Sequence, residues 1–105
     1  YGKKIALITA GEQWPDHTLR VAFEDLIGAG AIISYLTGNL SPESKTGLAI
    51  FERVKSNLLV EIENCNSGKE LIARGFKNDV LLACDFNVST NVPVLIANAY
   101  VGRRC

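Results

Sequence analysis

The chain has 105 residues, of which 48% are hydrophobic and 21% charged, so it fits one small globular domain with a single core. Its formal net charge is zero, which removes any overall attraction to nucleic acid or to an anionic membrane. No apolar run approaches the roughly 20 residues that span a bilayer, and the first residues do not have the form of a signal peptide. We therefore expect a cytoplasmic domain over residues 1–105, with neither a nucleic-acid nor a membrane partner.

Three cysteines and no methionine complete the composition. Cys65, Cys84 and Cys105 are an odd number at long spacings, which favours a reducing compartment over a disulfide framework. We expect Cys65 and Cys84 to lie on helices as small apolar residues. The absence of Met suggests a fragment, a processed chain or a trimmed one.

The first third of the chain predicts a strand, a loop and a helix. Residues 3–9 are apolar and β-prone, which predicts a buried strand. Residues 10–17 predict a loop, after which apolar residues recur with helical spacing over residues 18–36. Thr18 or Asp16 would cap this helix, and its last part, residues 31–35, could instead form a short strand.

Clear start and stop signals follow. Ser-Pro-Glu at residues 41–43 places an N-cap, a first-turn proline and an acid at the start of a helix that should run to about residue 63. Ser-Gly-Lys-Glu at residues 67–70 fits a capping box for a shorter helix, and Gly75 is suited to end it. A last helix should begin at residue 78 or 79 and extend to about Phe86.

A final apolar stretch at residues 92–101 predicts a strand with Pro93 at its start. The total is two or three strands with about four helices. This predicts an α/β fold, the helix-rich half of a layered α/β/α arrangement. A two-stranded sheet is marginal alone, so either the helices carry the core or the sheet is completed by other sequence or another subunit.

The residues that could bind a ligand or take part in catalysis cluster between Glu12 and Arg20. This segment also contains the only His and the only Trp. A loop at the carboxyl end of a strand is where open α/β sheets bind ligands. Glu12 and Asp16 could bind Mg²⁺, which takes carboxylate oxygens together with waters and substrate phosphates. Alternatively, Asp16 caps the following helix and Glu12 is solvated or paired with Arg20.

Arg20 is the cation of this region. Near helix N–H groups, its guanidinium could bind a phosphate, sulfonate or carboxylate through two hydrogen bonds; the alternative is an ion pair with Glu24. His17 could act as a general acid or be a surface residue. Trp14 could cover a ligand or anchor the loop by packing.

Several other classes of site are excluded by their missing motifs. The sequence contains no P-loop, no dinucleotide-binding glycine pattern and no zinc-ligand spacing. A Cys-x5-Arg phosphatase loop is also absent, because the sixth residue after Cys65 is Leu71.

Sequence blocks along nearly the whole chain resemble the 2-phosphosulfolactate phosphatase family. The blocks are Ala-Gly-Glu-x-Trp-Pro-Asp at 10–16, Leu-Arg at 19–20, Glu-Asp-Leu-Ile-Gly-Ala-Gly-Ala-Ile at 24–32, Ser-Pro-Glu at 41–43, Ser-Gly-Lys-Glu-Leu at 67–71, Arg-Gly-Phe at 74–76, Asp-Val at 79–80 and Val-Pro-Val-Leu at 92–95. Together they resemble the C-terminal half of a family member. His17 is a departure, since the family commonly has Gly after Pro-Asp.

The resemblance implies Mg²⁺-dependent hydrolysis of the phosphate monoester 2-phosphosulfolactate, which gives 3-sulfolactate and phosphate. In this chain Glu12 and Asp16 are the expected metal ligands, while Gly11, Arg20 and Asp25 are expected to bind the small anionic phosphate or sulfonate ligand. No catalytic residue is assigned. Because the N-terminal half is absent, we expect an inactive chain that forms a homo-oligomer or binds the missing half. The alternative is a non-catalytic binding or assembly module that kept the fold.

Overall fold

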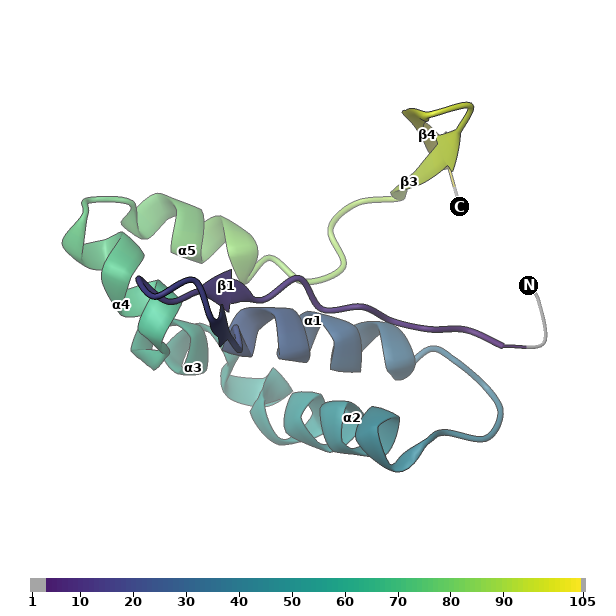
Figure 1. The fold of residues 1–105 in the computed structure, drawn as a ribbon, viewed down its shortest axis with the longest axis horizontal. Coiled ribbons are helices and arrows are strands. Elements are labelled where there is room, and N and C mark those ends of the chain that lie inside the picture. The colour runs from purple at the N-terminus through teal and green to yellow at the C-terminus, as the bar shows by residue number, and fades with distance from the viewer. Residues whose placement is uncertain (1–3, 105) are drawn as a thin grey trace.

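The computed structural model describes residues 4–104, whose regular structure consists of short α-helices and two antiparallel two-stranded sheets (Figure 1). The helices are α1 (Phe23–Ile33), α2 (Pro42–Val54), α3 (Leu58–Asn64), α4 (Asn66–Ala73) and α5 (Lys77–Ala83), with a 3-10 turn η1 (Lys55–Asn57) before α3. The strands are β1 (Glu12–Gln13), β2 (Leu19–Arg20), β3 (Asn91–Ile96) and β4 (Ala99–Arg104). The predicted helix-rich α/β class is confirmed.

The helices form the hydrophobic core, which is one of the two alternatives that the sequence left open. Its buried side chains come from α1, α2, α3 and α5 and comprise Ile27, Ala31, Phe51, Val54, Ile62 and Val80. Helical spacing over residues 41–63 predicts a buried stripe of Leu48, Phe51, Val54, Leu58 and Ile62, and Phe51, Val54 and Ile62 of this stripe are buried. Within residues 4–104 the hydrophobic core is therefore formed by helices, without a buried sheet.

Helices α1 and α2 form an antiparallel pair (Figure 1). Their backbones approach each other closely at Gly30 of α1 and Gly47 of α2. A Cβ placed on Gly30 would lie only 2.7 Å from Cβ of Phe51 and would also collide with the carbonyl of Gly47. By contrast, a Cβ on Gly28 would meet nothing within 4 Å. Gly30 is therefore required by a close approach of two backbones.

Two local signals are confirmed in atomic detail. Ser41 Oγ accepts a hydrogen bond from the backbone N–H of Ser44, and Pro42 is the first residue of α2. Gly75 has φ +89° and follows α4. The N–H of Phe76 then reaches the carbonyl of Leu71 at 2.9 Å, which is the Schellman arrangement.

Other boundaries differ from the prediction. The helix expected over 41–63 is interrupted by η1 at Lys55–Asn57. The capping box expected at 67–70 is wrong, because α4 begins at Asn66 with Cys65 as its N-cap. The last helix ends at Ala83 rather than near residue 86.

Cys65 and Cys84 lie at helix ends rather than within helices. Cys65 joins α3 to α4, and its Sγ accepts a hydrogen bond from the N–H of Gly68 at 3.4 Å. Cys84 is the C-cap of α5, and partial burial raises the pKa of its thiol. Cys105 lies outside the described residues.

The strand predicted at residues 3–9 is not formed over its described part. Residues 4–10 are extended, but no backbone–backbone hydrogen bond joins them to another described residue; Lys3 lies outside the described range. Strand pairing needs a neighbouring strand as well as a β-prone sequence, and the described chain brings none to this segment. The alternative strand at 31–35 is also wrong, because α1 continues to Ile33.

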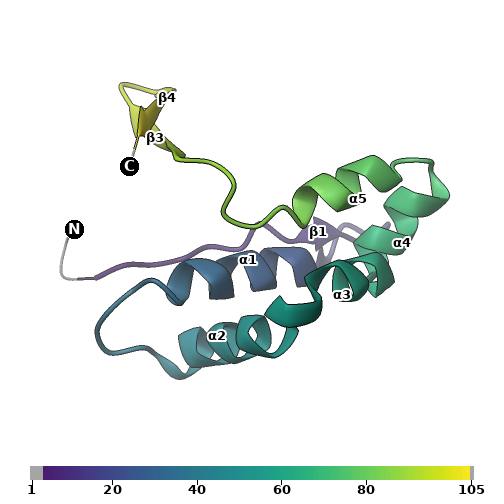
Figure 2. The same cartoon turned by 180° about the vertical axis from the view of Figure 1, so that it is seen from behind.

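The single strand predicted at 92–101 is instead the β3–β4 hairpin. Ala97 and Asn98 turn the chain with φ of +49° and +64°, the left-handed values of a type I′ turn. Figures 1 and 2 show that this hairpin stands away from the helices. Among residues 4–104, no helix is long and apolar enough to cross a membrane.

Candidate functional site

A small hairpin replaces the start of the helix predicted from residue 18. Asp16 accepts hydrogen bonds from the backbone N–H of Thr18 at 3.0 Å and from its hydroxyl at 2.6 Å, and these bonds lower the pKa of Asp16. The N–H of Trp14 meets the carbonyl of Thr18 at 2.9 Å. This turn chemistry overrides helix propensity, so α1 begins only at Phe23.

The turn also explains why the family commonly has glycine at residue 17 and how His17 is accommodated there. His17 has φ +67°, a left-handed conformation that glycine adopts at no steric cost and that His tolerates. Its ring Nδ1 lies 3.4 Å from Oε1 of Gln13, and the residue is exposed. His17 does not line the pocket described below.

Arg20 is fixed by three neighbours. Its Nη1 and Nη2 donate to the two carboxylate oxygens of Glu70 at 2.6 and 3.0 Å. Glu12 is its cross-strand partner, with a carboxylate oxygen 3.8 Å from Nη2. The guanidinium carbon also lies 5.2 Å from the ring centroid of Trp14, a cation–π distance. The side chain of Arg20 is thereby only 11% exposed.

These contacts show which partners Arg20, Trp14, Asp16 and Thr18 have in the structure. The ion pair of Arg20 with Glu24, one of the alternatives, is not formed; Arg20 pairs with Glu70 instead, and the alternative pair of Arg20 with Glu12 is present. The hydrogen bonds with Glu70 raise the pKa of Arg20 and lower that of Glu70. Trp14 serves as a support beneath the guanidinium. Neither Asp16 nor Thr18 caps a helix, because the N-cap of α1 is Ala22.

Gly11 and Asp25 join the preceding loop to the first turn of α1. The N–H of Gly11 donates to Oδ2 of Asp25 at 2.6 Å. Gly11 has φ +72°, and a Cβ there would lie 2.9 Å from Cδ1 of Leu19 and 3.2 Å from the carbonyl oxygen of Arg20. A glycine is therefore needed at this position for both backbone conformation and space.

These residues line a pocket of about 330 Å³ between the β1–β2 hairpin, α1 and α4. Its lining is Ala10, Gly11, Glu12, Arg20, Ala22, Glu24, Asp25, Ser67, Glu70, Leu71 and Arg74. Four carboxylates thus face two guanidinium groups. Such a lining suits a cation together with an anion better than an anion alone.

Four of the five residues expected at the site share this pocket: Gly11, Glu12, Arg20 and Asp25. Asp16, the other expected metal ligand, lies in the β1–β2 turn and does not line it. Sequence reasoning did not single out Ser67, Glu70 and Arg74, which also line this pocket, although they belong to blocks that carried the family resemblance. Within residues 4–104, no three or more His, Cys, Asp and Glu side chains gather as a group that could hold a metal ion.

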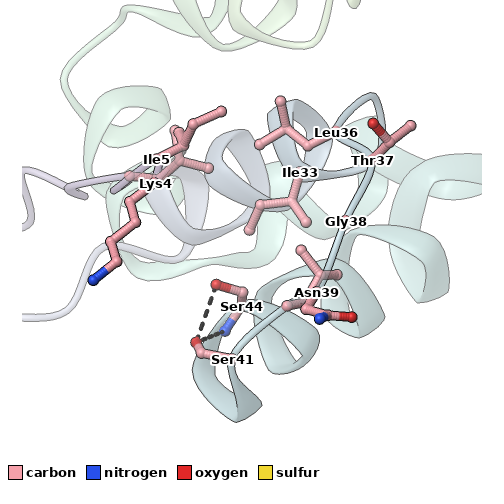
Figure 3. A pocket seen from close by; sticks show the side chains of 11 residues that line it. Lys4, Ile5, Ile33, Leu36, Thr37, Gly38, Asn39, Ser41 and Ser44 are labelled. Carbon is pink, nitrogen blue, oxygen red and sulfur yellow. Dashed lines mark hydrogen bonds between the residues drawn. The ribbon is translucent and has the colours of Figure 1, made fainter. Parts of the chain in front are cut away.

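A second pocket, of about 420 Å³, lies where residues 4–7 pass the loop between α1 and α2 (Figure 3). Lys4 is the charged side chain of its lining, and Thr37, Ser41 and Ser44 provide hydroxyls. The hydroxyl of Ser41 is already engaged with Ser44 in capping α2 (Figure 3). This pocket is larger but contains no carboxylate, so the Arg20 pocket is the better candidate for phosphate and metal chemistry.

The comparison with known protein families assigns the chain to a phosphatase family, and phosphatases are hydrolases. The family model for 2-phosphosulpholactate phosphatase matches residues 1–98, and the chain belongs to that family. No curated protein and no solved structure gives a significant match.

Proposed function

We propose that this chain is the C-terminal portion of a Mg²⁺-dependent phosphomonoester hydrolase of the cytoplasm that converts 2-phosphosulfolactate to 3-sulfolactate and phosphate. The observation that carries the proposal is the family membership together with a pocket in which Arg20 and Arg74 face four carboxylates. To bind a phosphate ester, this pocket needs a cationic contact. Because carboxylates line it, it also needs a metal ion that offsets the repulsion between those carboxylates and the phosphate.

Arg20 would hold the anionic ligand. A guanidinium has five N–H donors, and Glu70 occupies two of them. The remaining donors, with Arg74 nearby in the same lining, are available to phosphate or sulfonate oxygens. Gly11 has no side chain to obstruct the ligand, and Asp25 fixes the Gly11 backbone through its 2.6 Å hydrogen bond.

Glu12, which lines the pocket, and Asp16, which lies outside its lining in the β1–β2 turn, would hold Mg²⁺. Both offer hard carboxylate oxygens, and Mg²⁺ commonly takes only one or two from the protein. The Glu12 side chain is 57% exposed, so it can turn to a ligand. Asp16 commits Oδ1 to Thr18 and would bind through Oδ2. When bound, the metal would neutralise phosphate charge and activate water.

The chain by itself is proposed to be inactive. Phosphoryl transfer requires contacts that close around the transferring group from several directions. The pocket brings two guanidinium groups and a partial set of metal ligands from one side. The remaining contacts would come from an N-terminal portion of the same protein.

The alternative function is a non-catalytic binding or assembly module. One observation favours it: Arg20 is already paired with Glu70 and Glu12 and stacked near Trp14. A purely structural ion-pair cluster would have the same geometry. In that case phosphate would not displace or join these contacts.

The activity test is the release of phosphate from 2-phosphosulfolactate by the isolated chain with and without Mg²⁺. We expect no release above buffer. Metal-dependent turnover that Glu12→Ala abolishes would contradict the proposed inactivity. Binding of phosphate, described at the end of the Discussion, separates the hydrolase portion from the non-catalytic module.

A further inference from the structure

The pocket beside Arg20 contains a second guanidinium, that of Arg74, which is held by fewer contacts. Arg74 is the C-cap residue of α4 and lines the pocket together with Arg20. Arg20 donates to both carboxylate oxygens of Glu70, and its side chain is only 11% exposed. Arg74, in contrast, is exposed and forms no ion pair with any residue in the described range 4–104. Its five N–H donors are therefore not taken by a carboxylate of this part of the chain.

The Arg-Gly-Phe sequence at residues 74–76 explains how this guanidinium is positioned. Gly75 has φ +89° and turns the chain at the end of α4, where the N–H of Phe76 donates to the carbonyl of Leu71 at 2.9 Å. The turn places the ring of Phe76 with its centroid 5.5 Å from the guanidinium carbon of Arg74, a cation–π distance. The contact with the ring orients the guanidinium without using its N–H donors.

Ser67 adds a hydroxyl to the same part of the pocket. Ser67, Glu70 and Arg74 are spaced by three and four residues, which places them on one face of α4, and all three line the pocket. Glu70, between the other two, uses both carboxylate oxygens for Arg20. The half-buried Ser67 has a hydroxyl that can donate to an oxyanion. Ser67 and Arg74 together therefore offer donors for an acidic group of a ligand.

The four carboxylates of the lining each have a partner other than Arg74. These partners are Arg20 for Glu12 and Glu70, the N–H of Gly11 for Asp25, and the thiol of Cys65, at 3.8 Å, for Glu24. The hydrogen bonds from Arg20 are the main cause of the lowered pKa of Glu70, and the charges of Arg20 and Arg74 add to it. An acidic group can therefore reach Arg74 without first displacing one of these contacts.

We propose that Arg74 and Ser67 bind a second acidic group, a sulfonate or a carboxylate, of the same ligand whose phosphate Arg20 holds. This inference rests on the proposed function and makes Arg74 the residue that selects a phosphate ester with a further acidic group over a simple phosphate. Two guanidinium groups on separate elements, β2 and the end of α4, match two anionic groups of one small molecule. The volume of about 330 Å³ is at the small end of the range for ligand pockets.

The test is an NMR titration of the ¹⁵N-labelled chain in Mg²⁺ with inorganic phosphate, 2-phospholactate and 2-phosphosulfolactate. We expect 2-phosphosulfolactate to bind at least about tenfold more tightly than phosphate. Arg74→Gln should remove most of this advantage and leave the Kd for phosphate unchanged. 2-Phospholactate has the carboxylate but no sulfonate. A loss confined to 2-phosphosulfolactate therefore identifies the sulfonate as the group that Arg74 binds, and an equal loss for both esters identifies the carboxylate.

Arg53→Gln is the matched control, because Arg53 is also exposed but lies in the last turn of α2; it should leave all three Kd values unchanged. Both variants should keep the helix content of the wild type by circular dichroism. Equal weakening of phosphate and 2-phosphosulfolactate by Arg74→Gln, or no weakening of either, would overturn this inference alone, provided that phosphate binding still requires Arg20. Absence of phosphate binding to the wild-type chain would overturn the proposed anion site as well.

Discussion

Arg20 and Glu70 lie 50 residues apart in the sequence but share two hydrogen bonds of 2.6 and 3.0 Å. Because Arg20 is on β2 and Glu70 on α4, this pair joins the β1–β2 hairpin to the helical body. It also orients the guanidinium that the proposed function uses for the anion. Stability and ligand binding therefore depend on the same contact.

The first prediction concerns the charge of Glu70. Glu70→Gln keeps the shape of the side chain but removes the ionic component, and it should lower the urea midpoint at pH 7. Since Arg20 holds the folded-state pKa of Glu70 below its ordinary value of 4.5, the pair stabilises the fold above that value. The contribution is lost as pH falls through the lowered pKa.

Urea titrations of both proteins at pH 7 and at pH 3 measure this. The difference between wild type and Glu70→Gln should shrink at the lower pH. Glu61→Gln, on α3, is the matched control and should show a smaller difference at pH 7. Equal midpoints for wild type and Glu70→Gln at pH 7 would mean that the ion pair contributes nothing to stability.

The second prediction uses the two glycines of α1. Gly30→Ala should destabilise the fold by about 1–3 kcal/mol, because the added methyl enters the contact with Phe51 and Gly47. Gly28→Ala has open space and should stabilise the helix by up to about 1 kcal/mol. Thermal unfolding of the two variants checks the opposite signs. Similar changes in both would contradict the close approach of α1 to α2.

The third prediction concerns Phe51, which is 4% exposed and packs in the helical core. Phe51→Ala should cost about 3–5 kcal/mol of unfolding free energy. In a small domain that is a large part of the total. Chemical denaturation is the measurement, with Phe76→Ala as control, because Phe76 is 44% exposed. Comparable losses would argue against a core carried by the helices.

Local rules explain what the sequence could predict. The start of α2 at Ser41 and Pro42 and the stop at Gly75 depend on residues within one turn of each other. The apolar stripe through Phe51 follows from helical periodicity. These features need no knowledge of distant segments, so they were predicted correctly.

The failures all involve context beyond one turn or competition between local rules. Residues 4–10 have a strand's composition, but pairing depends on a neighbour that the sequence cannot place. Apolar periodicity favoured a helix from residue 18, but the side chain of Asp16 forms hydrogen bonds with Thr18 that stabilise a turn there instead. Glu70 was not expected to line the pocket, because only the tertiary fold brings α4 to Arg20.

The most direct test of the proposed site is a titration of the ¹⁵N-labelled chain with inorganic phosphate, followed by NMR with and without Mg²⁺. The largest amide shifts should fall within residues 10–20, with smaller ones around Glu70. Mg²⁺ should strengthen binding, because the carboxylates of the pocket otherwise repel phosphate.

Arg20→Ala should remove these shifts, whereas Arg53→Ala, at the end of α2, should retain them. This result would support an anion site that acts together with a metal ion. Shifts that cluster at Arg103 and Arg104, or that appear nowhere, would contradict it. The Arg20–Glu70 cluster would then be structural, and the non-catalytic module would be the correct account.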